Sequence, residues 1–508
     1  MLFAAFGSGP RVAPRHLCLH HAFEEQAKVR PDAVAVEHAG RSITYGQLNR
    51  QATTIAAHLV ENGVAPGDAV GLFLRRSIPM VVGILAVLKV GGAYVPQDAK
   101  IVPAKQLRQV LKQSRAQVVL TTTQHAPAIP SDDALPVDIE RLLDETADKS
   151  LSLQSTAPAL PDDRCFILFT SGTTGKPNGV QVTHRNVANI LLTSPGDLGV
   201  RPGLRVAQLL NIGFDMAAWE IFGCLCNGGT LLIRGDDMTD TASRADVIIA
   251  TPSILGAIDA NHCRNVKSVA VAGEPCPRPL ADKWAAFSTF YNCCGPTETT
   301  IVNTMQRHDP QAERLTIGRP IPNNTVYILD ENLKPAPIGE VGLMWAGGDC
   351  VTAGYVGNDA LTRERYQPDP FLGKGRMMFN TRDLGRWTPN GELEHLGRID
   401  DQVKVRGFRV ELDSVSTILE TVDGCEKAVT LKYDDRHLVA FVSPGEVDID
   451  QAFQAIETAL PYYCKPLMII GMDDWPRTSR GKVDRRRLMG LAIAQRPGRS
   501  NGSAEGVQ

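Results

Sequence analysis

The sequence contains no Cys-x-x-Cys pair, although eleven of its 508 residues are cysteines. Its two close pairs, Cys224 with Cys226 and Cys293 with Cys294, have no histidine or further cysteine at the spacing of a zinc site. This pattern argues against a zinc site and against a disulfide framework, and it is typical of buried thiols in a reducing compartment. We therefore expect a cytoplasmic protein.

The chain also lacks a charge excess and a long apolar run. Its 53 Lys and Arg residues nearly balance its 56 Asp and Glu residues, which leaves a net charge of -3 and no basic surface for nucleic acid. Apolar runs such as residues 81–90 are far shorter than the roughly 20 residues that cross a membrane. Residues 1–7 contain no charged region of the kind that opens a signal peptide. We expect neither a nucleic-acid partner nor a membrane partner.

Length and patterning indicate more than one α/β domain. A chain of 508 residues is longer than one hydrophobic core usually supports. Apolar runs of strand length alternate with amphipathic segments of helix length, which is typical of layered α/β folds. We expect a large domain over residues 1–398, a small domain over 399–492 and a disordered tail over 493–508.

Residues 169–179, Phe-Thr-Ser-Gly-Thr-Thr-Gly-Lys-Pro-Asn-Gly, follow an apolar run and form a loop suited to phosphate. Glycine lets backbone N–H groups converge on an anion, hydroxyls add donors, and a lysine adds charge. The spacing is not that of a P-loop, because Thr170 stands where that motif needs glycine and Pro177 where it needs serine or threonine. Ordinary turns favour the same residue types, so the loop alone leaves both interpretations open.

Further segments occur in a fixed order between residues 44 and 485, and they extend the match over most of the chain. Together with the loop, they resemble the adenylate-forming superfamily, and within it the amino-acid-activating adenylation domains of nonribosomal peptide synthetases. The resemblance implies an α/β fold: a large N-terminal domain of layered α/β subdomains with a small distorted barrel, and a small mobile α+β C-terminal domain. The segments are Thr44–Leu48, Leu88–Pro96, Phe214–Glu220, Gly295–Glu298, Asn380–Leu384, Gly397–Lys404 and Thr478–Arg485.

The resemblance implies a site for ATP and Mg²⁺. Activating a carboxylate with ATP brings two anions together, so the site must neutralise charge on the α-phosphate and on departing pyrophosphate. Thr297 and Glu298 would serve the α-phosphate and Mg²⁺. Asp383 would accept hydrogen bonds from the ribose hydroxyls, Lys482 would reach the cleft from the small domain, and Asp400 would be the hinge. The other implied nucleotide contacts are Thr170, Ser171, Gly172, Thr173, Thr174, Gly175, Lys176, Gly295 and Arg398.

Asp215 is the residue that the resemblance links to an amino-acid substrate, because this branch places an aspartate here to pair with the α-ammonium group. A carboxylate in an apolar cleft is unfavourable unless a cation arrives. The implied pocket positions are apolar or weakly polar, which favours a neutral side chain, although core packing would explain the same apolarity. These positions are Met216, Trp219, Ile249, Ala270, Ala272, Cys293, Ile301 and Val302.

Four positions depart from the pattern of the superfamily. Asn178 stands where a lysine is usual, so Lys176 is the only cation of the loop. Cys294 and His395 replace aromatic residues, and Arg382 replaces a glycine. We expect these changes to lower the affinity for the nucleotide.

The implied function is ATP-dependent activation of an amino acid to aminoacyl-AMP with release of pyrophosphate, followed by transfer to a phosphopantetheine thiol of a carrier protein. No carrier attachment serine follows Arg485, so the thiol is expected on another chain or on a missing segment. An acyl- or aryl-CoA ligase is an alternative that Asp215 disfavours. A catalytically silent nucleotide-binding domain is another, which the retention of Glu298, Asp383 and Lys482 disfavours.

Overall fold

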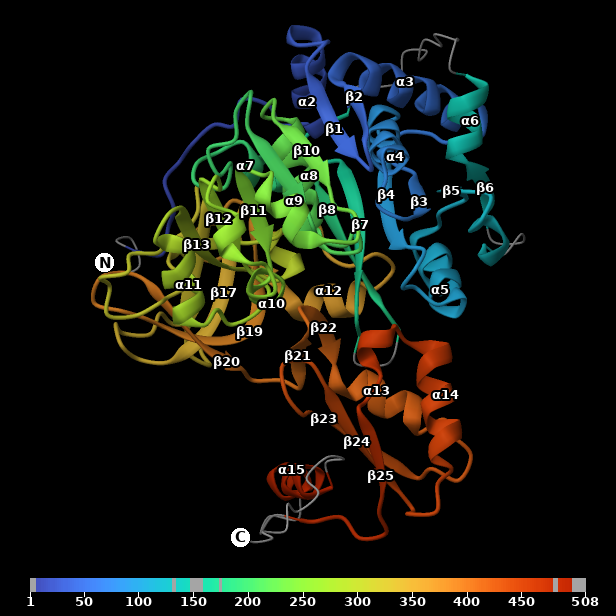
Figure 1. The fold of residues 1–508 in the computed structure, drawn as a ribbon. Helices are drawn as coiled ribbons and strands as arrows, with labels where there is room; N and C mark the ends of the chain where they lie inside the picture. The colour runs from blue at the N-terminus through green and yellow to red at the C-terminus, as the bar shows by residue number, and fades with distance from the viewer. Residues whose placement is uncertain (1–5, 130–133, 147–158, 173–175, 478–482, 496–508) are drawn as a thin grey trace, which may run out of the picture. The chain divides into compact units, whose positions relative to one another are not determined.

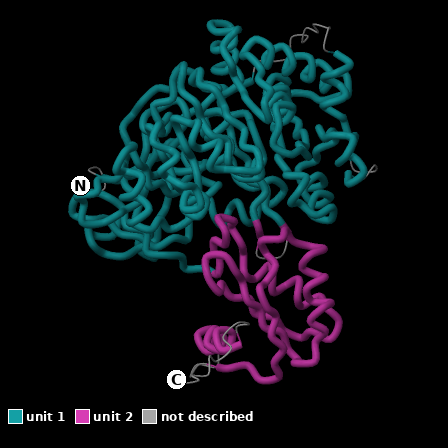
Figure 2. The backbone as a smooth tube through the Cα atoms, in the orientation of Figure 1, with its two compact units in different colours: residues 1–170, 177–400 teal, residues 171–176, 401–508 magenta. Residues whose placement is uncertain are grey.

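The computed structural model describes residues 6–129, 134–146, 159–172, 176–477 and 483–495 (Figure 1). Backbone contacts divide the chain into two units (Figure 2). Unit 1 contains residues 1–170 and 177–400, and unit 2 contains residues 171–176 and 401–508. The mixed α/β class expected from the sequence is confirmed. The domain limits of 398 and 492 remain predictions.

The first sheet of unit 1 has six strands, and all of them are parallel except the last. The order is β6-β5-β3-β4-β7-β8, and β8 pairs antiparallel with β7. The strands are β3 (Ala69–Leu74), β4 (Ala93–Asp98), β5 (Val118–Thr121), β6 (Leu135–Asp138), β7 (Arg164–Thr170) and β8 (Asn178–Thr183). The accompanying helices are α3 (Tyr45–Glu61), α4 (Ile78–Lys89), α5 (Ala104–Ser114), η1 (Ala126–Ala128) and α6 (Ile139–Glu145).

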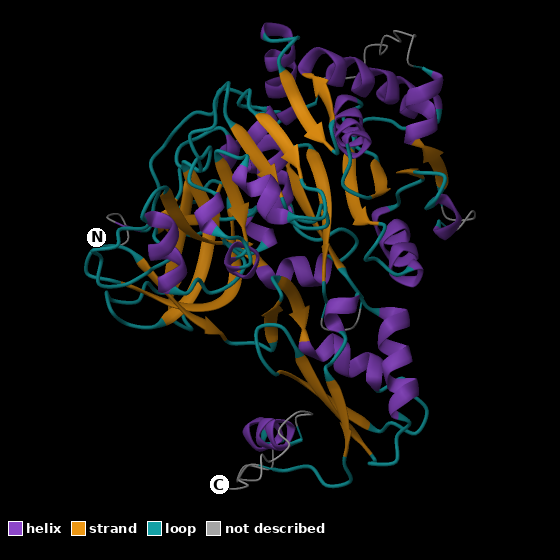
Figure 3. Cartoon of the chain, in the orientation of Figure 1, coloured by secondary structure: helices purple, strands orange, loops and turns teal. Residues whose placement is uncertain are grey.

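The second sheet of unit 1 has nine strands in the order β15-β14-β13-β12-β11-β9-β10-β1-β2. Its strands are β1 (Val34–His38), β2 (Arg41–Thr44), β9 (Arg205–Gln208), β10 (Thr230–Ile233), β11 (Val247–Ala250), β12 (Ser268–Val271), β13 (Thr289–Cys294), β14 (Thr304–Arg307) and β15 (Arg319–Pro320). Its helices are α2 (Leu19–Val29), α7 (His184–Leu191), α8 (Asp215–Leu225), α9 (Met238–Ser243), α10 (Pro252–Gly256), η2 (Ala260–His262), α11 (Arg278–Ala285) and η3 (Thr297–Thr299). Helices and strands form alternating layers in this unit (Figure 3).

The third sheet of unit 1 is antiparallel and has five strands. They are β16 (Asn324–Leu329), β17 (Gly342–Gly348), β18 (Tyr366–Pro368), β19 (Met377–Trp387) and β20 (Leu393–Arg398), with α12 (Asp359–Arg365) before β18. Unit 2 contains β21 (Gln402–Val405), β22 (Phe408–Glu411), α13 (Leu412–Leu419), β23 (Lys427–Lys432), β24 (Leu438–Ser443), α14 (Ile449–Ala459), η4 (Tyr462–Cys464), β25 (Met468–Gly471) and α15 (Arg485–Ala494).

Local sequence explains where helices α3 and α4 begin. The Thr44 hydroxyl accepts the N–H of Gln47, and the Gln47 side chain accepts the N–H of Thr44, so a capping box starts α3. The Ser77 hydroxyl caps α4 by accepting the N–H of Met80. Ten of the twelve residues of α4 are buried, as expected for a helix that is apolar on every side.

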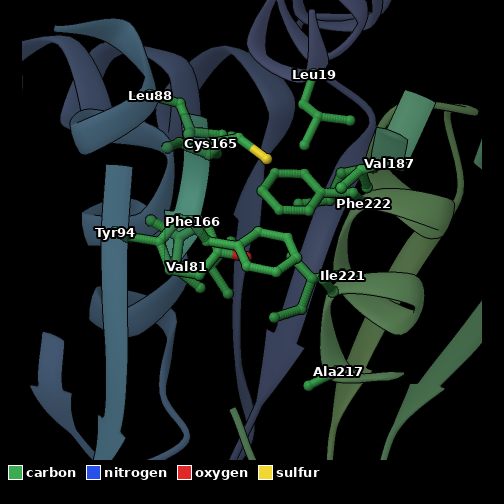
Figure 4. Packing of buried hydrophobic residues seen from close by; sticks show 14 of the residues in the cluster. Leu19, Val81, Leu88, Tyr94, Cys165, Phe166, Val187, Ala217, Ile221 and Phe222 are labelled. Carbon is green, nitrogen blue, oxygen red and sulfur yellow. The ribbon is translucent and has the colours of Figure 1, made fainter. Parts of the chain in front are cut away.

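The largest core of unit 1 joins its first two sheets (Figure 4). The ring of Phe222, on α8, lies 6.3 Å from the ring of Tyr94 on β4. Tyr94 in turn lies 5.3 Å from Phe166 on β7. Helix α8 therefore packs against β4, the neighbour of β7 in the sheet that carries the phosphate loop.

The cysteines are free thiols and none of them is exposed. Eight are buried and three, Cys276, Cys294 and Cys425, are partly buried. No helix among the described ranges is long and apolar enough to cross a bilayer.

Candidate active site

The phosphate loop connects β7 and β8, and hydrogen bonds hold these two strands where the loop begins and ends. Thr170, the last residue of β7, is opposite Asn178, and its hydroxyl donates to the Asn178 carbonyl over 3.4 Å. On the other side of β8, Val356 N donates to Gly179 O over 2.8 Å and Gln181 N to Gly354 O over 2.9 Å. Residues 353–356 therefore act as a further strand beside the hairpin.

The tip of the loop is described only in part. Ser171 and Gly172 are partly or fully buried, and the Lys176 side chain is exposed. Backbone contacts group these residues with unit 2. The predicted contacts Thr173, Thr174 and Gly175 lie outside the described residues.

Glu298 lies beside the extra strand of the hairpin. It is in the short helix η3 and only 1% exposed, and Tyr355 donates its hydroxyl to Glu298 Oε1 over 2.7 Å. Tyr355 also forms a β-bridge with Val180 of β8. The structure thus brings the predicted metal residue and the predicted phosphate hairpin together through Tyr355, a residue that the sequence analysis did not select.

A carboxylate oxygen suits Mg²⁺, but one carboxylate does not make a complete site. Within the described residues, no group of three or more His, Cys, Asp or Glu side chains is placed to hold a metal ion. Glu298 can supply one ligand to a Mg²⁺ ion whose other ligands are phosphate oxygens and water. Thr297 precedes Glu298 in η3, and Gly295 comes just before that turn. A Cβ at Gly295 would lie 2.5 Å from Val302 Cα, so only glycine fits the close approach of these two segments.

Asp383, on β19, is held by two basic side chains. Arg398 Nη1 donates to Asp383 Oδ1 over 2.8 Å, and His395 Nε2 lies 3.4 Å from the same oxygen. Burial would raise the pKa of Asp383, but the hydrogen bond from His395 and the charge of Arg398 outweigh it, so the pKa is lowered. His395, which departs from the superfamily pattern, therefore helps to keep Asp383, the predicted ribose-binding residue, ionised.

Arg398 joins Asp383 to the predicted hinge. Its Nε and Nη2 atoms donate to the two carboxylate oxygens of Asp400 over 2.8 and 2.9 Å. Arg382 approaches the same carboxylate at 3.7 Å and pairs with Glu364 at 2.5 Å. The φ of Arg382 is 60°, in the left-handed region that favours glycine, which explains why glycine is usual here.

Three of the predicted substrate residues lie on one face of the nine-stranded sheet. Ile249, Ala270 and Cys293 alternate along β11, β12 and β13 with residues of the opposite face, such as Ile248 and Val269. The predicted set forms part of a single buried cluster, and each member is at most 7% exposed: Met216, Trp219, Ile249, Ala270, Ala272, Cys293, Ile301 and Val302.

Asp215 is the first residue of α8 and is partly exposed. Trp219, one turn later, donates its indole N–H to Gly196 O over 2.7 Å, which fixes the ring in the wall of the cluster. Asp215 thus lies at the N-terminal edge of an apolar wall, where the helix dipole favours a carboxylate.

The predicted catalytic residue Lys482 lies outside the described residues. The remaining departures lie near the site residues: Cys294 ends β13, and the Asn178 side chain accepts from Asn358 Nδ2 over 3.5 Å. Arg76 and Glu220, whose contacts are described below, were also not selected from the sequence. A single acidic residue inside the apolar stretch of α8 was the available signal for Glu220.

A model of the AMP-binding enzyme family matches residues 23–356. The chain belongs to this family. It is therefore a member of the adenylate-forming superfamily, as the sequence analysis predicted, and this superfamily uses ATP.

The chain is similar to adenylate-forming reductases and to peptide synthetases. Two adenylate-forming reductases of Coprinopsis cinerea are 44% and 45% identical over 495 and 501 residues. These matches cover 97% of this chain and 48% of each relative. Gramicidin S synthase 1 of Brevibacillus brevis is 34% identical over 491 residues, which cover 94% of this chain and 44% of that protein. The chain spans about half the length of these relatives.

Solved structures show the same fold. The Vibrio cholerae adenylation domain AlmE, in complex with glycyl-adenosine-5'-phosphate, has a TM-score of 0.81 at 21% identity, over 96% of this chain and 99% of that one. The fused adenylation–PCP protein NpsA-ThdA of Klebsiella oxytoca has a TM-score of 0.79 at 23% identity, over 89% and 93%.

Proposed function

We propose that this chain activates an amino acid with ATP. A substrate carboxylate oxygen attacks the α-phosphorus, the bond to pyrophosphate breaks, and aminoacyl-AMP forms. The observation that carries the amino-acid assignment is the placement of Asp215 at the edge of an apolar wall, where a substrate ammonium group would pair with it.

The nucleotide assignment is supported by the surroundings of Asp383 and Glu298. Arg398 and His395 keep Asp383 ionised, and its two oxygens can accept several hydrogen bonds, so it can bind ribose hydroxyls while Arg398 holds it. Glu298 would hold Mg²⁺, which supplies charge neutralisation at the phosphates when bound. We also propose that Lys482 neutralises charge that develops on the reacting carboxylate and phosphate oxygens.

The acceptor of the activated acyl group is proposed to be the phosphopantetheine thiol of a carrier. Attack by the thiol on the acyl carbon would release AMP and form a thioester. The likeness to NpsA-ThdA, in which an adenylation domain is fused to a PCP domain, supports this step. A second candidate has specific support: the greater identity to adenylate-forming reductases favours activation of the acid for reduction instead of peptide synthesis.

Pyrophosphate exchange with a panel of amino acids and their desamino analogues tests the proposal. Exchange should depend on a neutral amino acid, and Asp215→Asn should reduce it at least ~10-fold, while the surface variant Asp162→Asn should leave it unchanged. Lys482→Ala should lower exchange by roughly two to three orders of magnitude. Equal exchange with the desamino acids would reject the amino-acid assignment and favour the acyl- or aryl-CoA ligase alternative.

A further inference from the structure

Glu220 is an acidic residue buried in the apolar part of α8. It is 0% exposed, and every residue of α8 after Asp215 is buried. Its Oε1 atom accepts the backbone N–H groups of Leu209 over 2.7 Å and of Leu210 over 3.1 Å. Its Oε2 atom accepts from Gln208 Nε2 over 2.9 Å. The carboxyl group therefore holds the chain at the point where it leaves β9.

Arg76 holds the carbonyl side of the same two residues. It lies in the loop that connects β3, a strand of the six-stranded sheet of unit 1, to α4. Its Nε atom donates to Leu210 O over 3.0 Å and its Nη2 atom to Leu209 O over 3.1 Å. Leu209 and Leu210 are thus bound through their N–H groups by an acid and through their carbonyls by a base. We call Arg76 and Glu220 the clamp.

The segment held by the clamp leads directly to the start of α8. Next along the chain, Asn211 donates from Nδ2 to Asp98 Oδ2 over 2.6 Å and accepts the Gly213 N–H over 2.7 Å. Phe214 N then donates to Asn211 O over 3.1 Å. Asp215 follows, so its backbone position depends on contacts to both large sheets and on the clamp, which holds Leu209 and Leu210 just before it in the chain.

Holding this loop with two ionisable side chains that are largely removed from water is energetically unfavourable. Burying ionisable side chains is unfavourable unless each is well hydrogen-bonded, and apolar residues of similar volume avoid this loss of hydration. A compensating benefit is the fixed geometry that a charge-pairing group needs before its ligand arrives.

We propose that Arg76 and Glu220 are positioning residues for substrate selection, which fix the place of Asp215 and so the discrimination between an amino acid and its desamino analogue. This inference rests on the proposed function. It concerns the amine-binding step and leaves nucleotide binding unchanged.

Two conservative variants test the clamp. Glu220→Gln keeps the volume but puts an amide NH2 group, which cannot accept, where Oε2 accepts from Gln208. Arg76→Lys keeps the charge but loses the fork that binds two carbonyls. Lys89→Met is the matched control: it removes another buried charge of the same unit, which pairs with Glu24 of α2.

The kinetic readout is the KM for the amino acid and the ratio of kcat/KM for the amino acid to that for the desamino acid. Both clamp variants should raise that KM and lower that ratio at least ~10-fold, while the KM for ATP stays within about twofold. The control should change neither. A parallel rise in both KM values, or an unchanged ratio, would show that the clamp only supports the fold.

Hydrogen exchange supplies a readout that does not depend on activity. Amides of residues 209–215 should exchange at least ~10-fold faster in both clamp variants and at the wild-type rate in Lys89→Met. Unchanged exchange would overturn the inference even if the proposed function holds. A wild-type enzyme that does not distinguish the amino acid from its desamino analogue would instead overturn the proposed function itself.

Discussion

Tyr355 links the two parts of the proposed phosphate site, because it hydrogen-bonds Glu298 and pairs with Val180 of the phosphate hairpin. A buried acceptor that loses its donor is destabilised by about 1–3 kcal/mol. Without the Tyr355 hydroxyl, the acceptor that loses its donor is the Glu298 carboxylate, which we assign to Mg²⁺. The state of this carboxylate therefore depends on a tyrosine 57 residues later in the chain.

We predict that Tyr355→Phe lowers pyrophosphate exchange about 10-fold or more and shifts its Mg²⁺ dependence to another concentration range. Titration of exchange with Mg²⁺ measures both effects. Tyr366→Phe is the control, because it removes a tyrosine hydroxyl that bonds Thr352 at 2.7 Å in the same cluster. The same Mg²⁺ response in both variants would show that Tyr355 acts only through packing.

Glu220 gives a prediction for the dependence of stability on pH. Burial raises its pKa from the usual 4.5 to about 8, and the backbone N–H groups of Leu209 and Leu210 and the charge of Arg76 offset only part of this rise. Between these two values the folded chain binds a proton that the unfolded chain has released. The contribution of Glu220 to the free energy of unfolding is therefore largest below pH 4.5 and decreases as the pH rises to about 8.

Relative to Glu220→Gln, the wild type should lose up to about 1.4 kcal/mol of stability per pH unit in that window, because one proton is released on unfolding. Urea unfolding at several pH values measures the difference. Parallel curves for the wild type and the variant would contradict the raised pKa.

At the scale of elements, the phosphate hairpin is set by a long-range pairing. A Cβ at Gly179 would lie 2.5 Å from Val356 Cγ1 and 2.8 Å from Phe169 Cζ, so the hairpin and the strand beside it meet where only glycine fits. This contact joins parts of the chain that are far apart in sequence.

We predict that Gly179→Ala reduces the free energy of unfolding by about 1–3 kcal/mol, because it forces these segments apart. Gly235→Ala is the control, since a Cβ there would have no atom within 4 Å. Urea unfolding compares the two variants. Equal free energies of unfolding for the two variants would mean that residues 353–356 can move aside without loss of stability.

The apolar run before residue 170 predicted a buried strand that delivers the loop, and β7 confirms it. The pairing of β8 with residues 353–356 could not be predicted, because those residues have no alternating pattern and their order comes from the partner strand. For the same reason Tyr355 and Arg76 were missed: each acts through a contact made only in the folded chain. The motif residues were found because the family resemblance, not local periodicity, marks them.

At the scale of the whole molecule, each unit has its own hydrophobic core. The buried clusters around Phe222 and Trp284 contain only residues of unit 1, and those around Val415 and Phe441 contain only residues of unit 2. Burial of apolar area is the main stabilising term in folding, so unit 1 carries what it needs to fold.

We predict that a fragment of residues 1–400 unfolds cooperatively on heating but has lost pyrophosphate exchange, because Lys482 is absent. Circular dichroism and the exchange assay measure the two properties. The full-length Lys482→Ala variant is the matched control for the activity, and exchange by the fragment would disprove the role of that lysine.

The protected state of the thiols has a consequence for kinetics. Nine of the eleven cysteines lie in unit 1, and Cys425 and Cys464 lie in unit 2. Since none is exposed, a thiol reagent can modify most of them only while the surrounding chain is open. The half-time of alkylation at each cysteine, read by mass spectrometry, is therefore a site-by-site measure of how often the native chain opens, and it is obtained for both units without introducing any label.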